Sequence, residues 1–236
     1  MLNTQKAPVS WTVSEQPTNL YAVSFDPGSL KTTGGQFSLV DGVSAGAFDV
    51  SNTGTLVYLP ATSEVVARNR STLVWVDRNG NEEPLPADPE AYDEPRISPD
   101  GKSVAVSINT DSNLDIYVLD IDSGRRMRVT WNEAADGNPI WVSDSKIAFA
   151  SAREGRLPGV YLKSANGTGD AEKLGSVPGI GLIPYSLSAD GKTLILIEIN
   201  IDGTDCIMAV PVEYEPTFKP LKPKDLFKSE KYIFHL

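Results

Sequence analysis

The chain has 236 residues and a formal net charge of −10 at neutral pH. Binding to nucleic acid or to an anionic membrane surface requires a concentrated basic surface, so this charge balance argues against both kinds of partner. The single cysteine, Cys206, cannot form an internal disulfide, and its position in an apolar strand predicts a buried thiol.

The N-terminal segment, MLNTQKAPVSWTVSEQ, lacks the charged and apolar regions of a secretory signal peptide. No apolar run approaches the length of about 18 residues that a membrane span needs, so we expect no membrane insertion. VSWTV, within this segment, and LYAVSF and GQFSLV, which follow it, are typical of the second, third and fourth strands of a four-stranded unit.

A tight turn followed by an alternating apolar strand recurs along the chain. EPRISPDGKSVAVS at residues 94–107 has counterparts in FDVSNTGTLVYLP, PIWVSDSKIAFAS and YSLSADGKTLILIE. A second set of segments, which includes TLVWVD, DIYVLD and GVYLKS, keeps the same period of about 45 residues, typical of one propeller blade per repeat. The sequence therefore predicts an all-β fold, a β-propeller of four-stranded antiparallel blades with almost no helix.

The best-preserved repeat shows how one blade is built. Its strands, named A to D in chain order, are expected near 94–98, 103–108, 115–121 and 125–130. In the A–B turn, Pro99 presets φ, Asp100 can bond the backbone, and Gly101 takes the left-handed position that closes the turn. Gly191 occupies the same position in a later repeat, so we expect φ > 0 at both glycines.

We expect a single β-propeller domain, residues 1–236, of about five blades. The expected repeats are 8–44, 45–92, 93–136, 137–182 and 183–230. The hexapeptide KYIFHL at 231–236 could close the ring by pairing near residues 9–13. The alternative is a piece of a larger propeller, whose open blade edges would favour a homo-oligomer.

These repeats resemble those of TolB-type propellers. EPRISPDGKSVAVS, followed by LDIYVLDIDSGRRMRVTWNEAADGNPIW, is most similar to the C-terminal propellers of bacterial membrane-anchored serine/threonine kinases. LVWVDRNGNEEPL and NLYAVSFDPGSLKTTG also resemble segments of that group. The resemblance implies a WD-like repeat protein with a non-catalytic role in protein binding or ligand sensing, and an extracytoplasmic or periplasmic location.

Two patterns that could carry chemistry are weak. GVSAG at 42–46 matches the serine nucleophile pattern, but the histidine such a site needs could only be His235, so we expect a loop before a blade. Acidic clusters such as DSNLD lack the spacing of a calcium loop, and one histidine with one cysteine cannot form a zinc site. We expect no enzyme activity, cofactor or metal; the alternative is a lactonase-like propeller hydrolase or the gating propeller of a peptidase.

A ligand, if bound, should meet the D–A and B–C loops around one mouth of the channel. Two D–A loops, PADPEAYDEP and WNEAADGNP, are acidic and could attract a basic peptide or a cation. The candidate ligand-binding residues at this mouth are Tyr92, Asp93, Asp136, Asn138 and Tyr185. The partner itself, a protein or a small molecule, is not identified by the sequence.

Aromatic residues recur at one position of the C strand, at Trp75, Tyr117 and Tyr161. Side chains at equivalent positions of successive blades face the neighbouring blade, so packing is favoured over a stacking platform for sugars or bases.

Overall fold

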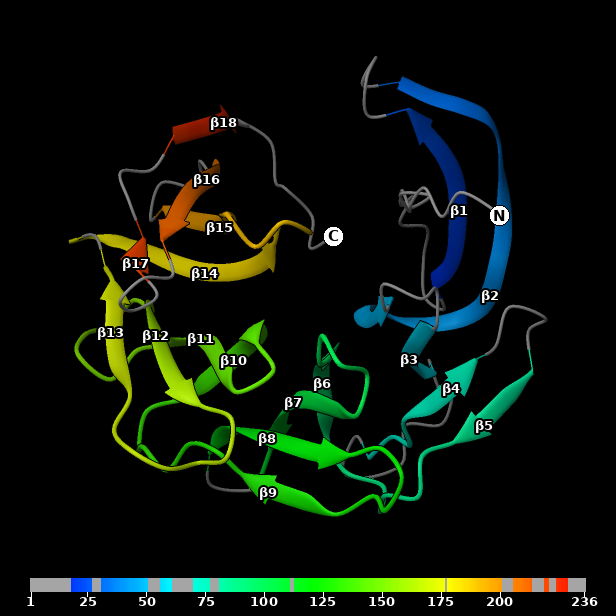
Figure 1. The fold of residues 1–236 in the computed structure, drawn as a ribbon, viewed down its shortest axis with the longest axis horizontal. Coiled ribbons are helices and arrows are strands. Elements are labelled where there is room, and N and C mark those ends of the chain that lie inside the picture. Colours follow the sequence, from blue (N-terminus) through cyan, green and yellow to red (C-terminus); the bar gives the residue numbers. More distant parts are fainter. Residues whose placement is uncertain are drawn as a thin grey trace.

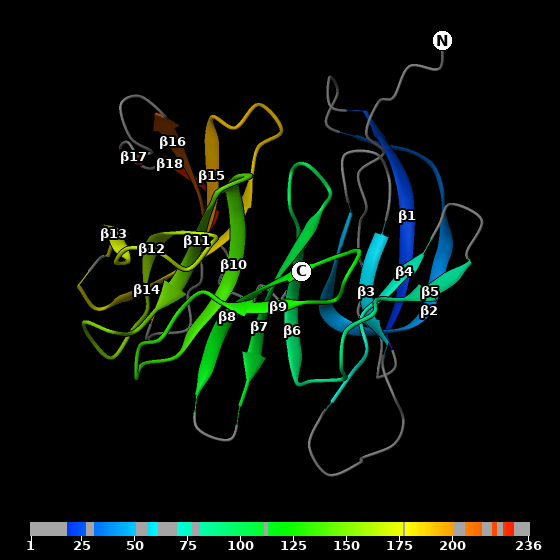
Figure 2. The ribbon, with the colours of Figure 1, turned by 60° about the horizontal axis from the view of Figure 1, so that its bottom comes forward.

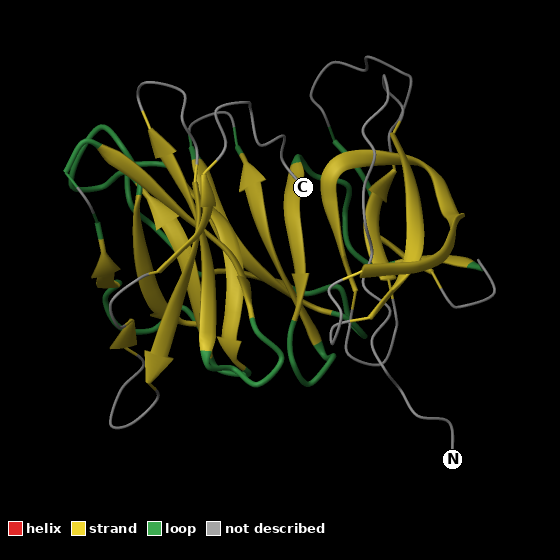
Figure 3. Ribbon diagram, turned by 90° about the horizontal axis from the view of Figure 1, so that it is seen from above, coloured by secondary structure: helices red, strands yellow, loops and turns green. Residues whose placement is uncertain are grey.

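The computed structural model describes residues 18–26, 31–50, 56–60, 70–76, 81–110, 113–176, 178–200, 206–213, 219–220 and 224–228. Strands and loops make up this part of the chain, and Figure 3 shows no helix in it. The all-β prediction is therefore confirmed. No helix that could span a membrane occurs within these ranges.

The first sheet joins the N-terminal strands to the blade that follows them. Its order is β1 (Thr18–Asp26), β2 (Lys31–Val50), β3 (Leu56–Pro60), β4 (Val74–Val76) and β5 (Glu82–Pro84). β2 has 20 residues; its first part pairs with β1 and its second part with β3, both antiparallel. Figure 1 shows β2 as one long curved strand.

This long strand corrects one expectation. We predicted a loop at GVSAG, but residues 42–46 lie inside β2. The segment from Gly42 to Ala47 contains small residues and no proline, so nothing in it stops a strand. The bend is absorbed by Gly42, whose φ is +73°, and by a register shift between Val43 and Phe48.

The second and third sheets are complete blades, each an antiparallel meander in chain order. The second sheet contains β6 (Tyr92–Ile97), β7 (Ser103–Asn109), β8 (Leu114–Asp120) and β9 (Arg126–Arg128). The third contains β10 (Asp136–Ser143), β11 (Lys146–Ser151), β12 (Gly159–Ser164) and β13 (Glu172–Gly175). The strands of the second sheet lie close to the four ranges expected for that repeat.

The last sheet has an outer edge shared by two short strands. β14 (Ile180–Leu187), β15 (Thr193–Asn200) and β16 (Cys206–Glu213) form an antiparallel meander. One end of β16 pairs with β17 (Lys219–Pro220) and the other end with β18 (Lys224–Lys228). Cys206 is 2% exposed, which confirms the prediction of a buried thiol.

The sheets follow one another around an arc, with β1 and β2 at one end and β14 to β18 at the other (Figure 1). The first strands of successive blades contact each other, β2 with β6, β6 with β10, and β10 with β14. Figure 2 shows β6, β7 and β10 side by side where the second and third sheets pack. The chain is thus a β-propeller of four-stranded antiparallel blades. The expected closing contact between 231–236 and 9–13 lies outside the described residues, and the division into one domain of five repeats stays a prediction.

Among the described residues, most of the apolar core lies between blades, because three of the four buried clusters combine side chains of two neighbouring sheets, while the fourth lies within the first sheet. Pairs that share a cluster across a blade boundary are Val57 with Val106, Ile116 with Phe149, and Val160 with Leu196. Burying one such side chain contributes about 1.5–3 kcal/mol. Tyr161 is 2% exposed within such a cluster, and Trp75 and Tyr117 are half-buried against another, so the predicted packing role of these aromatics is confirmed.

The A–B turns have the predicted backbone. Gly101 has φ +73° and Gly191 has φ +72°. In the first of these turns the Ser98 hydroxyl donates to the Asp100 carboxylate at 2.7 Å and accepts from the Ser103 amide at 2.9 Å. The turn is therefore held by side chains as well as by the positive φ of its glycine.

Gly101→Val should lower the free energy of unfolding by about 1–3 kcal/mol, because a β-branched residue is strained at positive φ. Gly101→Asn, which tolerates the left-handed region, should be milder. Chemical denaturation of both variants checks this, and a valine variant as stable as the wild type would contradict it.

Candidate binding site in the channel

A cavity of about 600 Å³ lies among the first strands of four blades, at the end where the A–B turns are found. Its walls come from β2, β6, β10 and β14 and from the turns that follow β6, β10 and β14. Lining residues that define its chemistry are Phe48, Asp49, Arg96, Trp141, Asp144 and Tyr185. This volume is within the usual range of small-ligand pockets. We refer to it as the channel cavity.

Arg96 is the cation inside the cavity and connects three blades. Its guanidinium donates to the Phe48 carbonyl at 3.3 Å and to the Pro95 carbonyl at 3.1 Å. The same group lies 6.0 Å from the centre of the Tyr185 ring. Burial raises the pKa of Tyr185 above its ordinary value, an effect that the charge of Arg96 opposes and that of Asp49 reinforces. Tyr185 is therefore neutral at physiological pH.

Two further bonds hold the walls together. The Asp49 carboxylate accepts from the Ile97 amide at 2.9 Å, and the Trp141 indole donates to the Arg96 carbonyl at 2.9 Å. Both bonds join one blade to the next, so the shape of the cavity depends on how neighbouring blades are set.

The rim of the cavity is acidic. Asp144 and Asp190 are exposed in the A–B turns, and Asp49 is half-buried in the wall. The Ser188 hydroxyl and the Lys192 amide donate to the Asp190 carboxylate and hold its pKa below the usual value. Three carboxylates against the single guanidinium of Arg96 make the lining electronegative, which favours a cationic ligand.

The five predicted site residues do not form one site but lie in different parts of the structure. Tyr185 lines the channel cavity. Tyr92 is buried and donates to the Asp88 carbonyl at 2.6 Å, and burial raises the pKa of Tyr92 to about 12. Asp93 is exposed, and its carboxylate accepts from the Glu94 amide at 2.9 Å. The cavity is thus at the opposite end of the first strands from the mouth where the sequence led us to look.

Asp136 is not the exposed loop carboxylate that we expected. It is 0% exposed at the start of β10, and it accepts from the Arg153 guanidinium at 2.9 and 3.0 Å. Arg153 in turn lies 4.6 Å from the centre of the Tyr161 ring. In the preceding blade, buried Asp115 pairs with Arg128 at 2.5 Å. Each carboxylate is therefore paired with an arginine within the fold. Asp136 lies in the core because β10 begins earlier than predicted.

Glu94 and Asn138 form a contact that sequence reasoning missed. The Asn138 backbone amide donates to the Glu94 carboxylate at 2.5 Å, its side-chain amide donates to the same group, and so does the Ser107 hydroxyl at 2.8 Å. Both residues have φ +52°, although neither is glycine. Each of them precedes a proline, Pro95 or Pro139, at equivalent positions of two repeats. This recurrence of a residue before proline was the feature of the sequence that could have pointed to the contact.

Among the described residues, no group of three or more His, Cys, Asp or Glu side chains is placed to hold a metal ion. The side chain of Ser44 and residue His235 fall outside what the structure describes.

Comparisons with known proteins find one family. The profile of the TolB β-propeller domain matches residues 69–216. The uncharacterised peptidase YuxL of Bacillus subtilis is 27% identical over 140 residues, which are 56% of this chain and 21% of that protein. The Tol-Pal system protein TolB of Francisella tularensis is 26% identical over 105 residues, 44% of this chain and 24% of that protein. The chain therefore matches only about a quarter of the length of these relatives, or less.

Among solved structures, a putative TolB from Agrobacterium tumefaciens superposes with a TM-score of 0.68 at 20% identity and covers 89% of this chain and 74% of that one. At this identity the similarity concerns the fold.

Asp136→Asn should lower the free energy of unfolding by about 2–3 kcal/mol, because it removes the charge that compensates nearly buried Arg153. Asp93→Asn, on an exposed carboxylate, should change it by less than about 0.5 kcal/mol. Urea denaturation of the two variants compares them, and equal stabilities would contradict the buried pairing.

Glu94→Gln should become more stable relative to the wild type as the pH rises from near 4.5. Burial raises the pKa of Glu94 above its ordinary value of 4.5, so the folded state holds this proton more tightly than the unfolded chain does. The stability of the wild type therefore falls as the pH rises through the folded pKa. Denaturation at a series of pH values checks this, with exposed Glu133→Gln as control; a difference independent of pH would refute it.

Proposed function

Because the chain belongs to the TolB β-propeller domain family, we propose that it is a non-catalytic recognition module that binds a cationic protein segment in the channel cavity. The observation that carries this proposal is an open cavity of about 600 Å³ lined jointly by four blades. Its volume suits one or two side chains of a polypeptide rather than a flat protein surface. The loops of a rigid scaffold are where recognition is usually placed.

The lining supports a positively charged ligand group. The rings of Phe48, Trp141 and Tyr185 provide π faces, and the structure already holds the guanidinium of Arg96 over one of them. Asp144 adds an exposed carboxylate at the rim. A lysine or arginine of a partner would therefore be attracted by the carboxylate at the entrance and would contact aromatic rings inside the cavity. The basic peptide or cation proposed from the sequence is kept, but at the other end of the channel.

A finer assignment follows from the repeat resemblance. We propose that the propeller acts as a sensor region similar to those at the C-terminal ends of bacterial membrane-anchored serine/threonine kinases, and that it works outside the cytoplasm. The sequence segments EPRISPDGKSVAVS and LVWVDRNGNEEPL support this. Association between copies through open blade edges is a further proposal, and the net charge of −10 is the reason to expect no nucleic-acid partner.

A second candidate is the propeller part of a peptidase. The similarity to YuxL, an uncharacterised peptidase, favours it. Labelling of the protein from its native host by a fluorophosphonate probe for active serine hydrolases would support this candidate, whereas binding without labelling would support the recognition module.

The test compares two peptides that differ in one charge, acetyl-Gly-Ala-Lys-Ala-Gly-amide and its glutamate counterpart. We expect the lysine peptide to bind more tightly by about two- to fivefold, the range of one exposed ion pair, and less so at high salt. Calorimetric titration measures both peptides.

Asp144→Lys should remove the preference for the lysine peptide, and Tyr185→Ala should weaken its binding through loss of the aromatic wall. Asp122→Lys, on a carboxylate exposed in the β8–β9 turn outside the cavity, is the matched control and should keep the preference. Equal binding of both peptides, or an unchanged preference in the Asp144 variant, would overturn the proposal.

A further inference from the structure

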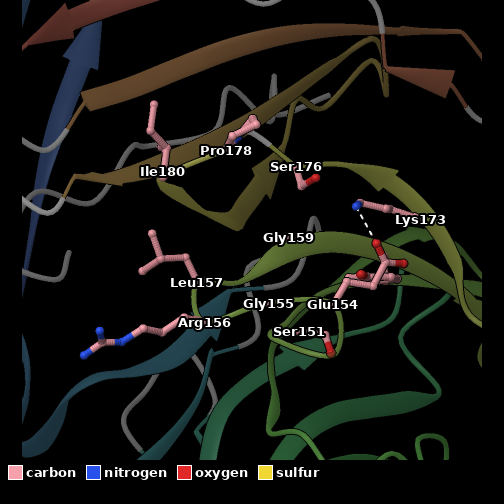
Figure 4. Close-up of a pocket in the computed structure, with 12 residues that line it drawn as sticks. Ser151, Glu154, Gly155, Arg156, Leu157, Gly159, Lys173, Ser176, Pro178 and Ile180 are labelled. Atoms are coloured by element: carbon pink, nitrogen blue, oxygen red, sulfur yellow. Dashed lines mark hydrogen bonds and ion pairs between the residues drawn. The ribbon is translucent and has the colours of Figure 1, made fainter.

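A second cavity lies on the outer part of the third blade and shares no lining residue with the channel cavity. Its volume is about 510 Å³, and its walls are the β11–β12 loop, β12, β13 and the start of β14. We call it the outer groove. Ser151 and Tyr161, 1% and 2% exposed, are buried residues of its lining. Figure 4 shows the side chains around it.

Glycines keep the groove open. A Cβ at Gly155 or Gly179 would meet no atom within 4 Å, so both positions border free space. Gly159 acts differently: a Cβ there would lie 3.0 Å from the Gly175 carbonyl, so glycine allows β12 and β13 to approach closely. The groove is thus a built feature of the strand pairing, with space that larger residues at its border would fill.

Among the described residues, two of the charged side chains that line the groove form an ion pair and the third does not. The Glu154 carboxylate is satisfied by the Lys173 ammonium at 2.6 Å and by the Tyr161 hydroxyl. Arg156 is exposed and forms no ion pair with any residue that the structure describes. One uncompensated guanidinium therefore remains at the groove of a chain whose net charge is −10.

Apolar and charged groups are separated along the groove. Figure 4 shows Arg156 and Leu157 next to each other, with the Arg156 guanidinium pointing outward and with Ile180 and Pro178 across the groove from them, while Glu154 and Lys173 face each other at the other end. An apolar body against Leu157, Pro178 and Ile180 would therefore place an attached anionic group within reach of Arg156. A positively charged group in the same place would be repelled by the Arg156 guanidinium.

We propose that the outer groove binds an anionic small molecule with an apolar body, whose carboxylate pairs with Arg156 while the body packs against Leu157, Pro178 and Ile180. The site is independent of the channel cavity and has the opposite charge preference.

Three probes of one shape test the proposal: 3-phenylpropionate, 3-phenylpropanamide and 3-phenylpropylamine. Protein amide shifts in nuclear magnetic resonance titrations give both the affinity and the location. We expect the carboxylate to bind about two- to fivefold more tightly than the amide, with the amine weakest and the shifts confined to residues 151–180. This preference should diminish as salt rises.

Arg156→Gln should abolish the preference for the carboxylate over the amide, whereas Arg125→Gln, on an exposed arginine outside the groove, should keep it. Gly155→Trp should weaken all three probes by filling the groove, with circular dichroism confirming that the variant is folded. Failure of the carboxylate to bind, binding of the amine as tight as that of the carboxylate, shifts that map to the channel cavity, or an unchanged preference in the Arg156 variant would each overturn the proposal.

Discussion

Hydrogen bonds between the first strands of neighbouring blades determine how this propeller is assembled. Backbone ladders hold each sheet together, and successive blades are joined mainly by side-chain hydrogen bonds and apolar packing, with one backbone bond from the Leu182 amide to the Pro158 carbonyl at 2.8 Å. Arg96 bonds the Phe48 carbonyl, Trp141 bonds the Arg96 carbonyl, and Asn138 bonds Glu94. The first of these bonds joins β6 to β2, and the other two join β10 to β6. The channel cavity exists because these bonds fix the angle between blades.

The region where the second and third blades meet also contains strained residues and buried carboxylates. Residues held at positive φ without being glycine cost of order 1–3 kcal/mol each, and Glu94 and Asn138 persist there because three donors converge on one carboxylate. Burial raises the pKa of Asp115, and the charge of the nearby buried Asp136 raises it further. Their arginines make this burial tolerable. Polar bonds thus set the geometry of the junctions, while the apolar clusters supply most of the stabilisation.

The two cavities differ in how they arise. The channel cavity needs four blades and has an electronegative lining, whereas the outer groove is formed within one blade and the start of the next and carries an uncompensated guanidinium. A propeller can carry both because its first strands and its loops present separate surfaces. Recognition of a cationic segment in one and of a small anion in the other would allow two ligands to bind without competing for the same residues.

The period of about 45 residues and the Ser-Pro-Asp-Gly turn determined the fold class, the strands of the best repeat and the positive φ of Gly101 and Gly191, because hydrophobic alternation and turn chemistry act over a few residues. Local patterns also indicated that the C-strand aromatics pack between blades. The continuous β2 was missed because small residues permit a turn and a strand equally. Whether Asp136 is an exposed charge or a buried partner depends on Arg153, 17 residues away in the chain. Only the tertiary structure could decide such pairings, and with them the end of the channel at which the cavity lies, because they depend on which side chains neighbouring blades bring together.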